Sequence, residues 1–239
     1  MHRFRFFGFA NSSGSWQVVE SEINHIVRVL RLKQGAEVEL CDGCGTVVVG
    51  IIDQMSPKKI TVRVLDKILS PKPDRSLHLI MGVLKPAVVE EALPFLTELG
   101  VDHISFFLQP GIAKSRFSPQ KIERFTKIIR GAFKQCKRSW LPTLEYYSSL
   151  ASCLESIDKD LFRVVLDPES SDHIAKLDFK SLKGVVGVIG GERGLDNAEL
   201  SFLKENNFVP LRVGKNILRA ITASIVFAGH CSILIDSQS

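Results

Sequence analysis

The chain has 239 residues and a formal net charge of +5, with 45% hydrophobic and 24% charged residues. No apolar run reaches the roughly 18–20 residues that span a bilayer, and the N-terminal segment lacks the length and cleavage site of a signal peptide. Five scattered cysteines, an odd number, do not suggest a disulfide framework. We therefore expect a cytoplasmic protein without membrane contact.

Residues 1–70 have the pattern of a compact all-β domain. Val47–Asp53 and Lys59–Leu65 are rich in valine and isoleucine and are separated by turn-forming residues, as two strands would be. One short helix interrupts the strands, because apolar residues recur at helical spacing over 22–30.

The spacing of Cys41 and Cys44 raises the alternatives of zinc binding, redox chemistry or a plain turn. A zinc site needs a second pair of ligands, and the sequence offers none at suitable spacing. The intervening Asp-Gly favours a hairpin turn between strands Glu37–Cys41 and Gly45–Ile52. We expect no metal site.

A proline-bearing linker, Ser70–Asp74, marks the domain boundary, and residues 71–239 alternate strands with helices. That order predicts an α/β domain with helices on both faces of the sheet. Pro94 should kink or break the first of its helices. The predicted strands are Ser76–Val83, His103–Leu108, Phe162–Leu166, Gly184–Ile189 and Phe208–Leu211. The predicted helices are Ala87–Leu99, Pro119–Lys137, Asp196–Asn206 and Ile217–Ile235.

Basic residues are concentrated around one of these helices. Between Lys114 and Arg138 nine basic residues accompany a single acid, Glu123, and such a concentration attracts polyanions. In the first domain Arg3 and Arg5 alternate with phenylalanines, and two further arginines lie off the apolar face of the short helix. For each arginine the alternative is ordinary solvated surface charge.

The sharpest local signal is the stretch Gly184–Leu200. A buried strand ends in Gly-Gly-Glu-Arg-Gly, and a helix follows at once with Asp196 as N-cap and Glu199 closing a capping box. Backbone N–H groups at such a turn can face a ligand, and a second loop of this kind follows at Val213–Arg219. Neither loop is a dinucleotide or Walker A fingerprint. Without a paired histidine or serine-elbow motif, a transfer reaction that depends on positioning fits best.

Five co-linear motifs resemble the RsmE family of knotted SPOUT methyltransferases. The clearest are Val188–Glu199, similar to the family's Ile-Gly-Pro-Glu-Gly-Gly-Leu-Ser-x-x-Glu, and Leu211–Ala223, similar to its Leu-Gly-x-x-Ile-Leu-Arg-x-Glu-Thr-Ala. Thr97–Val101, Ala132–Arg138 with Pro142, and His25–Gly35 with Asp42-Gly43 supply the others. The similarity extends from about residue 2 to residue 230.

The resemblance implies a PUA-like RNA-binding β-barrel (1–70) and a SPOUT methyltransferase domain (71–239) with a C-terminal trefoil knot. The implied activity is S-adenosylmethionine-dependent methylation of uridine N3 in 16S rRNA of the small ribosomal subunit, usually by a homodimer. The implied catalytic residue is Arg219, which would stabilise the anion that develops on the base. Its alternative role is packing at the helix start or a structural ion pair. The implied cofactor-binding residues are Leu166, Asp167, Ile189, Gly190, Gly191, Glu192, Gly194, Leu211, Val213, Gly214, Ile217, Leu218 and Thr222. The implied RNA-binding residues are Arg3, Arg5, Arg28, Arg31, Arg116, Arg124, Arg130, Lys134 and Arg138.

Three positions depart from the family pattern. Gly191, Arg193 and Ile221 replace a proline, a glycine and a glutamate, and a positive φ at Arg193 would be strained. They leave two alternatives open: an RNA-binding or ribosome-assembly protein that has lost turnover, and a SPOUT methyltransferase with a different RNA target. Glu192 has two open roles, orienting the cofactor or a loop, or placing an acid at a helix N-terminus.

Overall fold

The computed structural model describes residues 3–11, 14–178 and 183–237. The chain divides into two compact units. The first comprises residues 1–72 together with 134–141, and the second comprises 73–133 together with 142–239. The short segment 134–141 is far from the rest of the first unit in sequence, and the sequence patterns did not assign it there.

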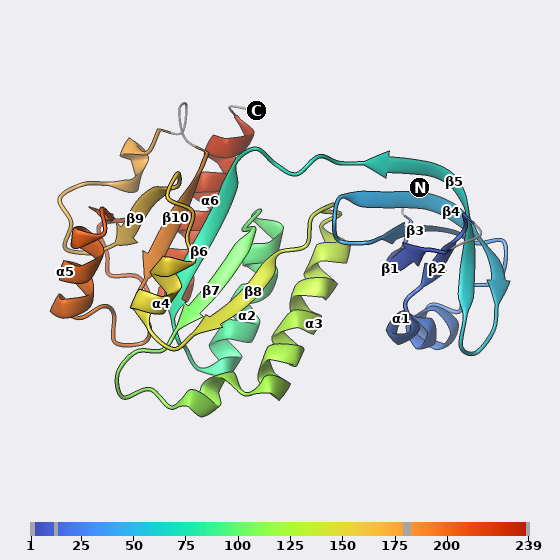
Figure 1. Ribbon diagram of the computed structural model, residues 1–239, viewed down its shortest axis with the longest axis horizontal. Coiled ribbons are helices and arrows are strands. Elements are labelled where there is room, and N and C mark those ends of the chain that lie inside the picture. Colours follow the sequence, from blue (N-terminus) through green and yellow to red (C-terminus); the bar gives the residue numbers. More distant parts are fainter. Residues whose placement is uncertain (1–2, 12–13, 179–182, 238–239) are drawn as a thin grey trace. The chain divides into compact units, whose positions relative to one another are not determined.

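The first unit is a closed five-stranded barrel with the strand order β1-β2-β5-β4-β3 (Figure 1). All neighbours are antiparallel except β1 and β3, which are parallel and close the barrel. Alternate strand residues fill the interior, where Phe6, Leu40, Ile52 and Val62 are almost completely buried. The strands are β1 (Arg5–Ala10), β2 (Trp16–Val18), β3 (Glu37–Cys41), β4 (Thr46–Met55) and β5 (Ile60–Leu69).

The expected helix of this unit forms in two parts. An α-helical turn, α1 (Glu20–Asn24), continues into a π-helical turn, η1 (His25–Val29). The wider turn is visible in the hydrogen bond from the Leu30 N–H to the His25 carbonyl, five residues back. Of the apolar face predicted from Ile23, Ile26, Val27 and Leu30, the two isoleucines lie in the barrel core and Leu30 packs against it, but Val27 is 42% exposed.

The predicted hairpin turn at Asp42-Gly43 is also confirmed. The Asp42 carboxylate accepts hydrogen bonds from the Cys44 and Thr46 N–H groups at 2.7 and 3.0 Å, and Gly43 has a φ of +79°. Burial raises the pKa of the Cys41 thiol to about 12, so this thiol does not ionise near neutral pH. The motif therefore has the structure of the expected turn, with Cys41 buried and Cys44 exposed.

The second unit contains a parallel six-stranded sheet in the order β11-β9-β10-β6-β7-β8 (Figure 1). Its strands are β6 (Ser76–Gly82), β7 (His103–Phe107), β8 (Thr143–Tyr147), β9 (Phe162–Leu166), β10 (Gly184–Ile189) and β11 (Val209–Leu211). Its helices are α2 (Pro86–Glu98), α3 (Pro119–Gln135), α4 (Leu150–Glu155), α5 (Asn197–Glu205) and α6 (Ala220–Asp236), with 3-10 turns η2 (Lys114–Phe117) and η3 (Ile174–Lys176). The last two residues of α3 belong to the first unit.

Helices cover both faces of this sheet, as predicted. Val186 and Val188 of β10 share a core cluster with residues of α4 and α5. Gly187 lies between them and faces the opposite side, where a Cβ atom would lie 2.4 Å from the ring of Phe227 in α6. The absence of a side chain at Gly187 therefore allows α6 to pack closely on the sheet.

Three details differ from the sequence predictions. Helix α2 continues through Pro94, between the fully buried Leu93 and Leu96, so the break predicted as one alternative does not occur. Helix α6 begins at Ala220, since Arg219 has extended backbone angles and acts as its N-cap. Strand β8 and helix α4 were not predicted, because β8 is a partly exposed edge strand and α4 has only six residues. No helix in the described ranges has the length and apolar character needed to cross a bilayer.

Candidate active site

The glycine turn follows β10 and is held by close backbone contact. A Cβ atom on Gly190 would lie 2.3 Å from the carbonyl carbon of Gly194, so only glycine fits there. The Gly194 N–H donates to the Gly191 carbonyl at 3.1 Å, and Gly194 has a φ of +74°. Arg193 is not among the described residues with positive φ, so the strain considered from the sequence does not arise.

The helix start after the turn has the predicted capping box. The Glu199 N–H donates to the Asp196 carboxylate at 2.8 Å, and the Asp196 N–H donates to the Glu199 carboxylate at 2.9 Å. Strand, turn and helix therefore have the geometry expected from the sequence.

Glu192, in the middle of the turn, is directed toward the start of α2. Its carboxylate accepts hydrogen bonds from the Lys85 N–H at 3.0 Å and from the Arg116 guanidinium at 3.2 Å. These contacts tie the glycine turn to two other segments at the same edge of the sheet. They favour the loop-orienting role for Glu192 over a role as a helix N-terminal acid.

The three predicted loops lie at the carboxyl ends of neighbouring strands. Leu166 of β9 pairs with Leu211 of β11, and β10 pairs with the other side of β9. Past the strand ends, the Asp167 N–H donates to the Leu211 carbonyl at 3.1 Å. In open α/β sheets this edge is where ligands bind, so the arrangement is that of a candidate site.

The chain after β11 is held against the loop that follows β9. The Arg212 N–H donates to the Asp172 carbonyl at 2.8 Å, and the Arg212 carbonyl accepts from the Ile174 N–H at 2.9 Å. In the described part of the chain, no residue from 213 to 218 donates a backbone N–H to another backbone group. A row of N–H groups without an internal acceptor is available to a ligand.

The predicted cofactor residues fall into two groups by exposure. The strand-end residues and the first two glycines of the turn are buried, whereas the loop residues are partly or fully exposed. Those buried are Leu166, Ile189, Gly190, Gly191 and Leu211. Those half-buried or exposed are Asp167, Glu192, Gly194, Val213, Gly214, Ile217, Leu218 and Thr222. The Asp167 carboxylate accepts from the Glu169 N–H at 3.0 Å and so orders its own loop.

Arg219, the predicted catalytic residue, lies between the third loop and α6. Its side chain is exposed, makes no cap hydrogen bond, and forms no ion pair with the residues that the structure describes. Of the two alternative roles weighed from the sequence, a structural ion pair is therefore not present among these residues, whereas packing at the helix start is not tested by these contacts. The guanidinium is free to meet a ligand.

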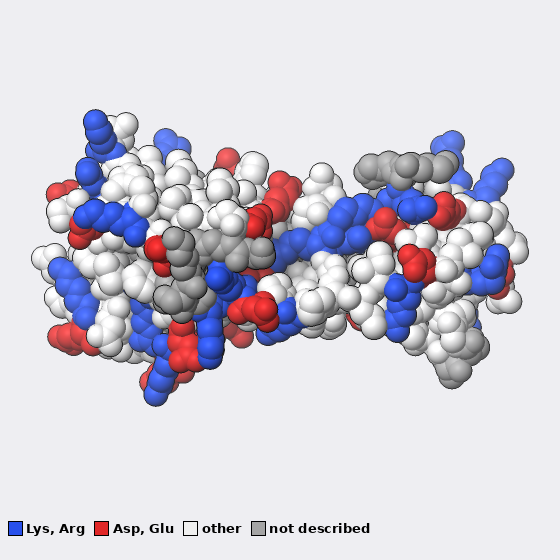
Figure 2. Space-filling view, turned by 90° about the horizontal axis from the view of Figure 1, so that it is seen from above, with Lys and Arg blue, Asp and Glu red and all other residues white. Residues whose placement is uncertain are grey.

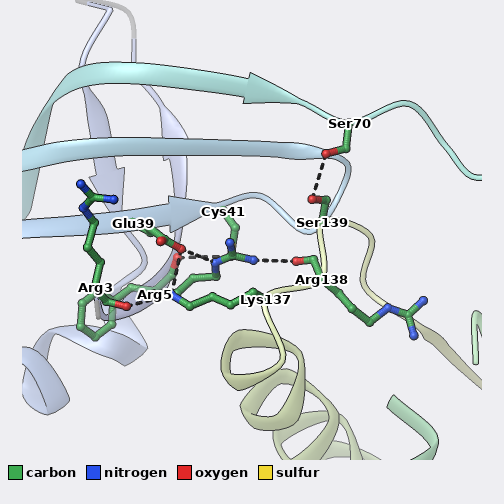
Figure 3. Close-up of polar contacts among 9 residues, drawn as sticks. Arg3, Arg5, Glu39, Cys41, Ser70, Lys137, Arg138 and Ser139 are labelled. Atoms are coloured by element: carbon green, nitrogen blue, oxygen red, sulfur yellow. Dashed lines mark hydrogen bonds and ion pairs between the residues drawn. The ribbon is translucent and has the colours of Figure 1, made fainter. Parts of the chain in front are cut away.

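Several of the predicted RNA-binding cations are engaged in ion pairs. In the barrel unit Arg5 and Lys137 share the Glu39 carboxylate, at 2.8 and 2.9 Å (Figure 3). Burial raises the pKa of Glu39, but the hydrogen bonds from Lys137 and Arg5 outweigh it, so the net pKa is lowered. The remaining pairs are Arg3–Glu37, Lys134–Glu22, Arg116–Glu192 and Arg124–Glu90.

Local acids therefore neutralise part of the basic concentration. Figure 2 shows acidic side chains beside many of the basic ones on the visible face. Arg28 and Arg31 are exposed and form no ion pair within the described part of the chain. Arg130 and Arg138 are half-buried, and the Arg138 carbonyl accepts from Arg5 (Figure 3).

Sequence reasoning missed one residue of the site, Gln109, which follows β7. Its side chain reaches the glycine turn at Gly191 and the capping box at Glu199. It also lines an open, mostly apolar cavity of about 490 Å³ with residues of the loop after β7, α4 and α5. The sequence showed a polar residue just past a predicted strand end, but the neighbouring residues did not indicate which distant groups it contacts.

Comparison with known proteins agrees with this architecture. A family model described as an RNA methyltransferase domain matches residues 70–232, and one described as an RNA methyltransferase PUA domain matches residues 20–65. The fold and the site thus define an RNA methyltransferase with an N-terminal PUA-like barrel.

Relatives make the assignment more specific. A ribosomal RNA small subunit methyltransferase E of Helicobacter pylori is 32% identical over 174 residues, covering 72% of this chain and 71% of that protein. The protein of the same name from Buchnera aphidicola is 27% identical over 208 residues, covering 85% and 81%. The chain belongs to this family, ribosomal RNA small subunit methyltransferase E, or RsmE, as the sequence motifs indicated.

Solved structures share the whole fold. The RsmE of Neisseria gonorrhoeae bound to S-adenosyl methionine superposes with a TM-score of 0.86, at 19% identity and 98% coverage of both chains. A putative Legionella pneumophila methyltransferase in complex with the same cofactor superposes with a TM-score of 0.84, at 23% identity, covering 99% of this chain and 98% of that chain. These likenesses establish the fold.

Proposed function

We propose that this protein methylates N3 of a specific uridine in 16S rRNA, with S-adenosylmethionine as the methyl donor. Family membership supports the reaction class, and the names of the relatives support the small ribosomal subunit as the source of the RNA. The observation that carries the proposal is the exposed Arg219 guanidinium, which has no partner among the described residues and lies beside a loop with unused N–H donors. Because the substrate is ribosomal, we place the protein in the cytoplasm.

The residues of the three loops suit the proposed cofactor. S-adenosylmethionine has an adenine ring, a methionine moiety with a carboxylate, and a sulfonium centre that supplies the methyl group. The unpaired N–H groups of residues 213–218 offer donors for adenine nitrogens or the carboxylate. Ile217 is 80% exposed and supplies an apolar surface for the ring, and Gly214 leaves open space. The backbone and apolar character of these loops fits such a ligand.

Arg219 acts on the uridine. N3 must lose its proton before its lone pair attacks the methyl carbon, and negative charge then spreads onto the adjacent carbonyl oxygens. A guanidinium beside them stabilises that charge and favours the deprotonated base. The N3–methyl bond forms as the sulfur–methyl bond breaks, S-adenosylhomocysteine leaves, and the N3 proton passes to solvent.

The RNA would be held largely through its phosphates. Arg28 and Arg31 are the strongest candidates in the barrel unit, because both are exposed and neither is in an ion pair with a described residue. Arg5 and Lys134 instead serve the internal cohesion of that unit, since their charges are matched by Glu39 and Glu22. Binding should weaken steeply as salt rises.

We further propose a homodimer formed through the methyltransferase unit. Helices α2 and α6 pack against each other, and apolar side chains remain exposed on them. Phe95 of α2 is 46% exposed, and Val226 and Ile233 of α6 are 43% and 70% exposed. A second copy covering this surface would remove these side chains from water.

The deciding experiment is mass spectrometry of 16S rRNA nucleosides from a strain that lacks the gene. We expect 3-methyluridine to disappear and to return when the wild-type gene, but not an Arg219→Ala gene, is restored. Persistence of 3-methyluridine would refute the proposal. Loss of a different nucleoside would indicate the alternative RNA target. An assembly defect without loss of any nucleoside would indicate the non-catalytic alternative.

A further inference from the structure

The side chain of Gln109 bridges two features that the sequence shows only as neighbours, the glycine turn and the capping box of α5. Gln109 lies two residues beyond the end of β7 and is half-buried. Its Oε1 accepts a hydrogen bond from the Gly191 N–H at 3.0 Å. Its Nε2 lies 3.0 Å from the Gly194 carbonyl and 2.9 and 3.1 Å from the Glu199 carboxylate oxygens.

These contacts fix which way the amide points. The Gly191 N–H can only donate, whereas the Gly194 carbonyl and an ionised Glu199 can only accept. A flipped amide would leave the Gly191 donor facing an NH₂ group and two acceptors facing an oxygen. The side chain therefore has one satisfied orientation and acts as a clamp between residues 191, 194 and 199.

The surrounding glycines leave room for this clamp. A Cβ atom on Gly191 would lie 2.4 Å from the Gln109 Oε1, and so would a Cβ atom on Gly82 at the end of β6. Either distance is too short for non-bonded atoms, and the Cβ atom on Gly82 would also lie 2.4 Å from the Gly191 nitrogen. The two strand ends and the glutamine amide thus interlock, and each glycine is required where the amide approaches.

We infer that Gln109 is a positioning residue that holds the glycine turn in its ligand-binding conformation. This inference rests on the proposed function, because the ligand meant is S-adenosylmethionine. The clamp bonds to the Gly191 N–H and the Gly194 carbonyl, which fixes the 190–191 and 194–195 peptide planes at the two ends of the turn and so restricts the direction of the polar groups between them. Gln109 itself is not a catalytic residue.

The test is Gln109→Glu, which keeps the shape and exchanges the NH₂ donor for an acceptor. The introduced carboxylate, when ionised, cannot donate to Gly194 or Glu199, and it lies beside the Glu199 carboxylate, which raises the affinity of both groups for a proton. We expect the Kd for S-adenosylmethionine, measured by calorimetry, to rise on the order of tenfold at pH 8, which corresponds to about 1.4 kcal/mol. As pH falls, the introduced carboxyl group takes up a proton and regains a donor, so the affinity of the variant should recover while that of the wild type stays level.

Gln120→Glu is the matched control, because Gln120 is exposed at the start of α3 and the substitution makes the same change in charge. Its Kd and pH profile should match those of the wild type. The inference is overturned if Gln109→Glu binds like the wild type at every pH, or if Gln120→Glu shows the same loss. It is also overturned if the lost affinity does not recover on acidification, since a general packing defect would not be relieved by a proton.

A double-mutant cycle tests the interlock. Gly191→Ala should weaken binding in the wild-type background, because the new methyl group displaces the amide. In a Gln109→Ala background the amide is absent and the nearest remaining atom is the Val83 carbonyl oxygen at 3.3 Å, so the same substitution should cost much less. Additive effects would contradict the clamp.

Amide hydrogen exchange separates failure of this inference from failure of the proposed function. With no ligand present, the Gly191 N–H should be protected in the wild type and should exchange at least about tenfold faster in Gln109→Ala. If the wild type does not bind S-adenosylmethionine but Gly191 is protected only when Gln109 is present, the proposed cofactor is wrong and the clamp stands. Equal exchange rates in both proteins would refute the clamp whatever the ligand.

Discussion

Replacing Glu39 with glutamine removes the negative charge that Arg5 and Lys137 share in the barrel unit (Figure 3). The Arg5 side chain is 8% exposed and that of Glu39 15%, so the pair is largely shielded from water, whereas Lys137 at 33% is partly solvated. Lys137 also has a φ of +62°, an unfavourable conformation for a lysine that these contacts help to hold.

The expected loss of stability follows from how deeply these side chains are buried. Removing one partner of a fully buried pair costs about 3–5 kcal/mol, because the other charge is left uncompensated. Lys137 is partly exposed and glutamine keeps one acceptor oxygen, and both reduce this cost. We therefore expect Glu39→Gln to lower the free energy of unfolding by about 2–3 kcal/mol at pH 7. The matched control is Glu37→Gln, whose partner Arg3 is 37% exposed, and we expect about 0.5 kcal/mol.

Tryptophan fluorescence during urea unfolding measures this unit selectively. The protein has two tryptophans, and both Trp16 and Trp140 belong to the barrel unit. Trp16 is buried, and the indole N–H of Trp140 donates to the carbonyls of Ser70 and Pro71. The midpoint should fall for Glu39→Gln with an unchanged m-value. A change no larger than that of Glu37→Gln would refute the reasoning.

Acid provides a second check. The pKa of Glu39 is lowered below its ordinary value of 4.5, so the folded state binds this proton less readily than the unfolded state. The stability that the carboxylate contributes is therefore present above about pH 4.5 and is lost as pH falls through the folded-state pKa. The difference in the free energy of unfolding between wild type and Glu39→Gln should therefore shrink below about pH 4. A constant difference down to about pH 3 would mean that the loss is one of packing.

Three further predictions concern the proposed activity. Arg219→Ala should lower the rate of methyl transfer by about 10²–10³-fold while changing cofactor affinity and thermal stability little, because its exposed side chain makes no cap bond; an equal loss of cofactor binding would make Arg219 structural. Changing Arg28 and Arg31 together to alanine should weaken RNA binding at low salt and reduce the slope of log K against log salt by about 1–2 in filter-binding assays; an unchanged slope would exclude them from phosphate contact. Ile233→Glu should convert the proposed dimer to monomer in sedimentation velocity, and an unchanged sedimentation coefficient would place any dimer interface elsewhere.

Local sequence was enough for features that are built locally. The turn at Asp42-Gly43, the strand Gly184–Ile189 and the capping box of Asp196 and Glu199 formed where expected. Each depends on side chains within a few residues of one another, so its signal is contained in a short window. The five co-linear motifs, each also contained in a short stretch of sequence, were sufficient to identify the family.

The long-range contacts were decided by tertiary structure. Gln109 meets Gly191 82 residues away in sequence, and Lys137 meets Glu39 98 residues away. Periodicity shows which face of a helix or strand is buried, but it does not show which distant segment lies opposite. For the same reason the sequence predicted Lys134 of α3 as an RNA-binding residue without showing its ion pair with Glu22. The sequence by itself therefore determined the local elements and the family, whereas only the packing of distant segments decided which charges remain available to RNA and what holds the glycine turn.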